Sequence, residues 1–168
     1  MSLDGYIAGL NDSLDFLATV EKEGEDYGYA AFLETVDSII IGRKSYDKVL
    51  SMKISYQYTN KEVYIITRTP KPNEGSFHYY TGGLKELVVK LKYETTLPRL
   101  NIYCDGGAEI VNELMKDNLI DEYIISIIPV MLGNGVTLFH DKRPSTKLKL
   151  IATKTFESGL VQLRYTTE

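Results

Sequence analysis

The stretch Ser38-Ile39-Ile40-Ile41-Gly42-Arg43-Lys44-Ser45-Tyr46 decides the fold of this chain. Its three consecutive isoleucines predict a buried strand over Ile39–Ile41. The glycine lets the chain turn sharply, and two cations and a hydroxyl then begin a predicted helix over Lys44–Leu50. Backbone N–H groups at a helix N-terminus, beside a guanidinium and an ammonium, suit a phosphate at Gly42, Arg43, Lys44 and Ser45. A strand-turn-helix with solvated basic residues explains the stretch as well, and the stretch alone does not decide between them.

A second glycine turn has the same form. The segment Asp105-Gly106-Gly107-Ala108 follows a predicted strand over Leu100–Cys104 and opens a predicted helix. It offers close backbone approach and a helix dipole to a pyrophosphate at Gly106, Gly107 and Ala108. A structural turn capped by Asp105 is the alternative. The segment lacks G-x-G-x-x-G, so it is not the Rossmann fingerprint.

Elements elsewhere in the chain alternate between helix and strand through residue 120 and are strands alone after it. The patterns predict helices over 25–36 and 84–91, strands over 63–67, 77–81 and 123–130, and a hairpin formed by 148–156 and 160–165. This order predicts an α/β fold of three αβα layers, with a mainly parallel twisted sheet and an antiparallel C-terminal edge. We expect one domain over residues 1–168.

Ligands of such sheets bind at the carboxyl ends of the strands. The turns after Ile41, Thr67, Thr81 and Cys104 would therefore line one cleft. At the second of these turns, Thr67 and Arg68 suit an isolated phosphate such as a ribose 2′-phosphate, and a surface turn is the alternative. Thr81 suits either an adenosine shelf or a helix N-cap, and the sequence favours the cap.

Two polar residues are candidates for a substrate pocket. Asp26 begins the predicted helix over 25–36, where a carboxylate at a pocket mouth and a dipole-stabilising residue are both reasonable. Ser126 lies inside an apolar strand, where its hydroxyl needs a partner in the backbone or in the same pocket. His78 and His140 have no companions at ligand spacing, so we expect no metal site. Cys104 has no evident histidine partner, which disfavours a cysteine nucleophile.

Composition limits the functional classes. The chain has 168 residues, of which 43% are hydrophobic and 25% charged, as in ordinary globular proteins. A net charge of −4 argues against general affinity for nucleic acid or anionic membranes. A single cysteine excludes an intrachain disulfide and fits the cytoplasm. We see neither a signal peptide nor an apolar stretch near the ~18 residues that a membrane span needs.

Taken together, these segments resemble the dihydrofolate reductase fold, and within it the branch built like the C-terminal reductase domain of the riboflavin enzyme RibD. The resemblance spans nearly the whole chain. Its matching segments are Ser2–Ala8, Asn11–Leu17, Ile41–Tyr46, Tyr103–Gly107 and the P-x-x-L-G-x-G stretch Pro129–Gly135. Each motif is weak alone, but their order is a strong signal.

The resemblance implies NADPH as hydride donor and a heterocyclic small-molecule substrate. By matching position it places Ile7 and Ala8 by the nicotinamide, and Asp26 with Ser126 at the protonated ring of the substrate. Phosphates would be held by the residues of the first glycine turn, by Thr67 and Arg68, and by the second glycine turn. The best named activity is reduction of 5-amino-6-(5-phosphoribosylamino)uracil. Its 5-phosphate would need further cations, for which Lys48, Lys53 and Arg143 are available.

Two departures from the family keep alternatives open. Residues 9–25 contain neither the Trp nor the prolines of folate enzymes, which disfavours dihydrofolate reduction. The first strand is short before Asp4-Gly5, so we expect either missing residues or an edge filled by a partner. A non-catalytic nucleotide-binding homologue is the second alternative. The apolar strands over 123–130 and 148–156 make a homodimer plausible.

Overall fold

The isoleucines at the centre of strand β2 (Ser38–Gly42) are completely buried in the computed structural model, which describes residues 1–52, 58, 60–93, 101–141 and 145–168. β2 lies inside a parallel sheet of order β4-β3-β2-β5 and therefore has a strand on each side. Its neighbours are β3 (Glu62–Ile66), β4 (Phe77–Tyr80) and β5 (Ile102–Cys104). A strand paired along both edges and covered on both faces has no solvent-facing position, which explains its continuous apolar run.

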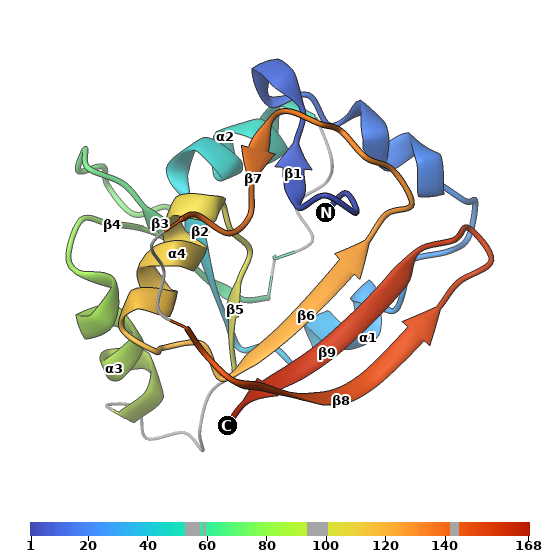
Figure 1. Ribbon diagram of the computed structural model, residues 1–168. Coiled ribbons are helices and arrows are strands. Elements are labelled where there is room, and N and C mark those ends of the chain that lie inside the picture. The colour runs from blue at the N-terminus through green and yellow to red at the C-terminus, as the bar shows by residue number, and fades with distance from the viewer. Residues whose placement is uncertain (53–57, 59, 94–100, 142–144) are drawn as a thin grey trace. The chain divides into compact units, whose positions relative to one another are not determined.

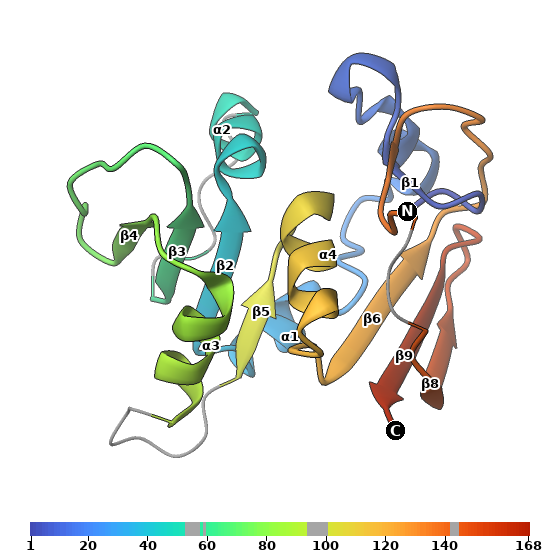
Figure 2. The ribbon, with the colours of Figure 1, turned by 60° about the vertical axis from the view of Figure 1, so that its left-hand side comes forward.

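Four helices alternate with, or directly flank, the strands of this sheet in chain order. They are α1 (Tyr29–Glu34), α2 (Arg43–Ser51), α3 (Leu84–Tyr93) and α4 (Ala108–Lys116). One face of the sheet carries Val63 and Ile65 of β3, which pack with Leu33, Val36 and Tyr46 in one core cluster. Figure 2 shows β2, β3 and β5 pointing the same way, with α2 starting at the tip of β2.

A second, antiparallel sheet has the order β6-β9-β8. Its strands are β6 (Glu122–Ile127), β9 (Val161–Thr167) and β8 (Leu148–Thr155), the three long adjacent arrows of Figure 1. β8 is an edge strand whose residues are all exposed, among them Leu148, Leu150 and Ile151. Exposed apolar residues on an unpaired edge are where a second copy of the chain would pair, and the homodimer stays a prediction.

The amino-terminal segment is held by the residues that follow β6. The backbone N–H of Ile128 donates to Met1 O at 2.8 Å, and that of Leu3 donates to Val130 O at 2.8 Å. After a turn, β1 (Tyr6–Ala8) pairs antiparallel with β7 (Val136–Thr137). Two short 3₁₀ helices follow, η1 (Leu10–Asp12) and η2 (Asp15–Val20).

The predicted elements are confirmed with shifted ends. The parallel strands, the helices that follow them and the C-terminal hairpin are present. The helix expected over 25–36 is wrong at its start, because α1 begins only at Tyr29. Tyr27 and Gly28 have positive φ angles of 57° and 79°, which a right-handed helix does not allow. The strand expected from 123 to 130 ends at Ile127, and Leu100 of another expected strand lies outside the described residues.

Contacts divide the chain into two units, and each is described by itself below. One comprises Met1–Gly28 with Met115–Glu168, and the other Tyr29–Leu114. The first has its own core of Phe16, Val20, Ile128 and Leu160. Within the described ranges, every helix is too short or too polar to cross a membrane.

The carboxylate of Asp4 fastens the opening segment to the P-x-x-L-G-x-G stretch. It accepts hydrogen bonds from Ser2 Oγ at 2.6 Å, Leu132 N at 3.1 Å and Gly133 N at 2.7 Å. These donors, with the Ser2 hydroxyl foremost, lower the pKa of Asp4 below its ordinary value of 3.8. The opening motif Ser2–Ala8 and the stretch Pro129–Gly135 are thus joined into one hydrogen-bonded structure.

We expect Asp4→Asn to lower the melting temperature at pH 7, because the amide is a weaker acceptor for three donors. A carboxyl whose pKa is lowered on folding contributes stability above its ordinary pKa, and this contribution is lost as pH falls through the folded value. The difference between the two proteins should therefore shrink below about pH 3.8. Thermal unfolding followed by circular dichroism between pH 3 and 7 measures it. A difference that is the same at every pH would contradict the role of the charge.

Candidate functional site

The parallel sheet brings its polar turns to one edge. β2 pairs with β3 so that Gly42 lies opposite Ile66, and β3 pairs with β4 so that Ile66 lies opposite Tyr80. On the other side of β2, Ile40 lies opposite Cys104. All four strands therefore end at the same edge, as the sequence predicted. The candidate phosphate residues of this unit follow these strand ends.

The two glycine turns are joined directly. Gly42 N donates to Gly106 O at 2.7 Å, and Asp105 N donates to Ile40 O at 2.9 Å. A methyl group at Gly42 would lie 3.2 Å from the Ile110 side chain and 3.5 Å from the backbone of the second turn. The pairing of β2 with β5 thus continues into the turns, and glycine at position 42 allows the close approach.

Glycine is also required within the second turn. Gly106 has a φ of +92°, which side chains rarely adopt. A methyl group at Gly107 would lie 2.9 Å from Ser45 Oγ, so this turn packs on the first turn of α2. The Gly106–Gly107 peptide bond is cis. The structure therefore brings together Gly42, Ser45, Gly106 and Gly107, all predicted from sequence.

The start of α2 combines an uncapped helix N-terminus with positive charge. Its N-cap is Gly42, which has no side chain that could accept hydrogen bonds from the first-turn N–H groups. Arg43 Nε donates to Asp47 Oδ1 at 2.7 Å, and this bond raises the pKa of Arg43. Lys44 is exposed. At the second glycine turn, the predicted pyrophosphate residue Ala108 is buried and is the first residue of α4.

The turns after β3 and β4 hold the remaining phosphate candidates. Thr67 N donates to Tyr80 O at 3.0 Å, which joins the two strand ends. The Thr67 hydroxyl accepts from Thr69 N at 3.1 Å, so it already supports its own turn. Arg68 and Thr81 are exposed. The side chain of Arg68 forms no ion pair with any residue that the structure describes.

The residues predicted for the nicotinamide and the substrate belong to the other unit. Ile7 and Ala8 lie on β1, and Ala8 is buried. The β7 side approaches them so closely that a methyl group at Gly135 would lie 2.1 Å from Ala8 O. Gly135, with a φ of +138°, is therefore needed to keep β1 in place.

Asp26 and Ser126 both accept hydrogen bonds from other residues of the chain. Asp26 is exposed, and its Oδ1 accepts from Gly28 N at 2.8 Å in the turn before α1. Ser126 is half-buried on β6, where its Oγ accepts from Gln162 Nε2 at 3.3 Å and its carbonyl oxygen accepts from the Met1 amino group at 2.6 Å. Their catalytic roles stay predictions. Lys48 is exposed, while Lys53 and Arg143 lie outside the described residues.

The half-buried carboxylate of Asp105, which the sequence suggested only as a possible cap of the second glycine turn, accepts hydrogen bonds from two tyrosines. Asp105 Oδ1 accepts from Tyr103 at 2.7 Å, and its Oδ2 accepts from Tyr58, whose hydroxyl lies 3.0 Å from that of Tyr29. Burial raises the pKa of Asp105, and the two tyrosine bonds partly offset that rise. The same burial raises the pKa of Tyr58 and Tyr103. Tyr103 lies on β5 and Asp105 directly follows the strand, and their spacing of two residues is the signal that the sequence offered for a contact on one side of the chain.

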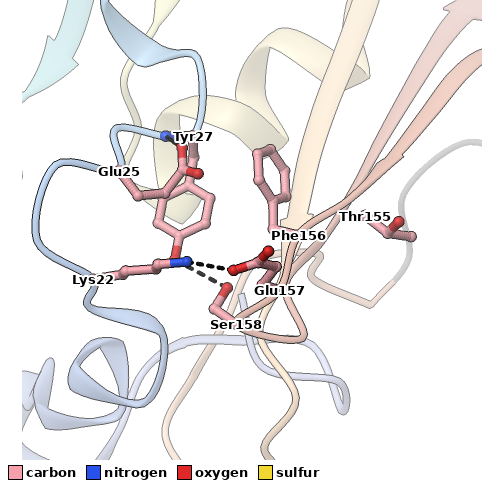
Figure 3. A pocket seen from close by; sticks show the side chains of 7 residues that line it. All are labelled: Lys22, Glu25, Tyr27, Thr155, Phe156, Glu157 and Ser158. Carbon is pink, nitrogen blue, oxygen red and sulfur yellow. Dashed lines mark hydrogen bonds and ion pairs between the residues drawn. The ribbon is translucent and has the colours of Figure 1, made fainter.

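A polar cavity of about 300 Å³ lies in the unit formed by Met1–Gly28 and Met115–Glu168. Figure 3 shows it between the segment before α1 and the hairpin of β8 and β9. Lys22 Nζ forms an ion pair with Glu157 at 2.6 Å, and the Tyr27 hydroxyl lies 3.0 Å from Ser158 Oγ. These bonds fasten the segment to the hairpin. Over the described part of the chain, no three His, Cys, Asp or Glu side chains come together as metal ligands do.

Comparison with known families decides where the chain belongs. The family model for the RibD C-terminal domain matches residues 1–162. The chain belongs to this family. Its relatives include the uncharacterized protein YwjB of Bacillus subtilis strain 168, which is 41% identical over 166 residues, 98% of this chain and 92% of YwjB.

Solved structures agree with the assignment. A crystal structure of a Shewanella sp. PV-4 protein, assigned provisionally to riboflavin biosynthesis, has a TM-score of 0.89 at 31% identity over 100% of this chain and 95% of that one. The Thermotoga maritima diaminohydroxyphosphoribosylaminopyrimidine deaminase/5-amino-6-(5-phosphoribosylamino)uracil reductase has a TM-score of 0.71 at 13% identity. This chain covers 54% of that bifunctional protein, and the likeness shows the fold. The expected resemblance and the dihydrofolate reductase-like fold are thus confirmed.

We expect Tyr103→Phe to destabilise this RibD C-terminal domain by about 1–3 kcal/mol at pH 7, because an oxygen of the half-buried Asp105 carboxylate loses its donor. Since Asp105 binds its proton more tightly folded than unfolded, stability falls as pH rises from the ordinary value of 3.8 through the folded pKa. The variant should steepen that fall. Urea unfolding at pH 5 and pH 7 measures both effects. Tyr64→Phe is the matched control, because the Tyr64 hydroxyl makes no hydrogen bond within the described residues. Equal losses of stability in the two variants would contradict the prediction.

Proposed function

We propose that this RibD C-terminal domain is an NADPH-dependent reductase of a pyrimidine or pterin-like heterocycle, of the 5-amino-6-(5-phosphoribosylamino)uracil reductase type. The observation that carries the proposal is the joined pair of glycine turns at the carboxyl edge of the parallel sheet, where Gly42 N meets Gly106 O. Backbone donors, an uncapped helix start and positive charge at that edge are what a dinucleotide diphosphate requires.

The residues present fit such a cofactor. Arg43, Lys44 and Ser45 supply charge and donors beside the pyrophosphate turn, and a side chain at Gly107 would come within 2.9 Å of Ser45 Oγ. NADPH, when bound, supplies the hydride. The roles of Arg68 at the 2′-phosphate, of Ile7 and Ala8 at the nicotinamide, and of Asp26 and Ser126 at the substrate complete the proposal by resemblance.

A second candidate is a nucleotide-binding homologue without catalysis. It is favoured by one observation: Asp26 is exposed and its carboxylate accepts from Gly28 N in a local turn. A proton donor to a substrate ring is expected in a site from which water is excluded. The two candidates share cofactor binding and differ in turnover.

Cofactor binding should appear as thermal stabilisation. At ~100 times its dissociation constant a ligand adds roughly 2.7 kcal/mol to the stability of the folded state. We expect NADPH to raise the melting temperature at concentrations where NADH does not. Oxidation of NADPH, followed by its absorbance with pyrimidine and pterin substrates, then separates the reductase from the non-catalytic homologue. Failure of both nucleotides to stabilise the protein would contradict both candidates.

Replacement of Arg43 tests the phosphate site itself. Arg43→Ala should weaken NADPH binding by about 1.5–3 kcal/mol, as expected for a charged hydrogen bond, in isothermal titration calorimetry. Asp47→Ala is the matched control, because it removes the same ion pair within α2 while keeping the guanidinium. Equal weakening by the two variants would assign Arg43 a role in the helix and not at the cofactor.

A further inference from the structure

Two cations converge on one aromatic ring at the carboxyl edge of the parallel sheet. The guanidinium carbon of Arg43 lies 5.7 Å from the centroid of the Tyr79 ring, and Lys71 Nζ lies 5.6 Å from it. Tyr79 is half-buried on β4 and packs against the core cluster. Arg43 belongs to the predicted phosphate turn, whereas no pattern in the sequence predicts that Lys71 lies beside it.

The chain between β3 and β4 directs Lys71 to this ring. Lys71 stands between Pro70 and Pro72, which fix their own φ angles and hold the preceding residues extended. At the far end of the segment, Tyr79 N donates to Asn73 Oδ1 at 3.1 Å. The segment is therefore tied to β4, and Lys71 reaches the ring of the residue that the same segment binds.

The ring holds the ammonium group without neutralising it. A cation over an aromatic face keeps its full charge. Lys71 is exposed, and the Tyr79 contact is its recorded interaction within the described part of the chain. Glu74 lies near enough to Tyr46 to raise its pKa, but it forms no ion pair with Lys71 among the described residues. Two like charges near one ring repel each other, and a bound anion would relieve that repulsion.

The order of the strands indicates which phosphate this is. The glycine turns follow β2 and β5, while Lys71 lies in the segment between β3 and β4 and Tyr79 lies on β4, on the other side of β2 from β5. Arg43 is the first residue of α2, directly after the first glycine turn, and it still reaches the Tyr79 ring, so the ring site lies on the β3–β4 side of that turn and away from the second turn after β5. We therefore expect a phosphate bound at the ring to be a different one from the pyrophosphate at the second turn.

We propose that Lys71, held in place by the ring of Tyr79, joins Arg43 and the Arg68 of the proposed function in recognising the ribose 2′-phosphate of the cofactor and so favours NADPH over NADH. This assignment rests on the proposed function. A phosphate monoester is nearly dianionic at neutral pH, and two cations that approach it from separate elements suit it better than one. Lys71 is then a residue of cofactor specificity.

The test uses a fragment that carries only this end of the cofactor. Isothermal titration calorimetry should show that Lys71→Ala binds 2′,5′-ADP about tenfold more weakly than the unaltered protein. Binding of 5′-AMP, which lacks the 2′-phosphate, should not change. Lys90→Ala is the matched control, because Lys90 is an exposed lysine in the last turn of α3. The dependence of 2′,5′-ADP affinity on salt should also become shallower in Lys71→Ala alone.

The outcomes separate this inference from the proposed function. If the unaltered protein prefers 2′,5′-ADP and Lys71→Ala keeps that preference, the assignment of Lys71 is wrong and the cofactor proposal stands. If neither 2′,5′-ADP nor NADPH binds the unaltered protein, both are wrong. Tyr79→Phe keeps the ring face and should keep the preference. A loss in Tyr79→Phe equal to that in Lys71→Ala would overturn the role of the cation–ring contact.

Discussion

The hydrogen bond from Gly42 N to Gly106 O is the interaction on which the candidate site depends. It extends the pairing of β2 and β5 by one step past the end of the strands and into two turns that lie far apart in sequence. Because Gly42 has no side chain, the second turn can approach it, and because Gly106 has a positive φ, that turn can bend back. The starts of α2 and α4 then meet at one edge, which is the basis of the proposed cofactor site.

Charge at this edge is placed by short-range contacts, each of which restricts one side chain. Arg43 is bonded to Asp47 and lies by Tyr79, and Lys71 is held between two prolines and meets the same ring. Side chains fixed in this way lose less conformational entropy when they bind an anion than free surface lysines do. The half-buried Asp105 differs from these cations, because its carboxylate accepts hydrogen bonds from two tyrosine hydroxyls of the protein itself.

The unit that holds Asp26 and Ser126 is organised by backbone contacts of the chain's first residues. Asp4 accepts from the backbone of Leu132 and Gly133, and Gly135 lets that loop approach Ala8. The opening motif and the P-x-x-L-G-x-G stretch are thus two halves of one structure. The resemblance to the RibD C-terminal domain rests on both motifs, and these hydrogen bonds join them in the folded chain.

Local sequence by itself determined the strands and the helices at this edge, because β-branched runs, glycines and apolar spacing act over a few residues. It also predicted Gly42, Ser45, Gly106 and Gly107 as one group, since parallel strands end at the same edge. Only the tertiary structure decided the start of α1, where positive φ angles at Tyr27 and Gly28 override an apolar pattern. It also decided the partners of Asp105 and the place of Lys71, because these contacts join residues that no local spacing relates. Side-chain contacts between distant segments depend on how the elements pack, and the sequence pattern does not record that packing.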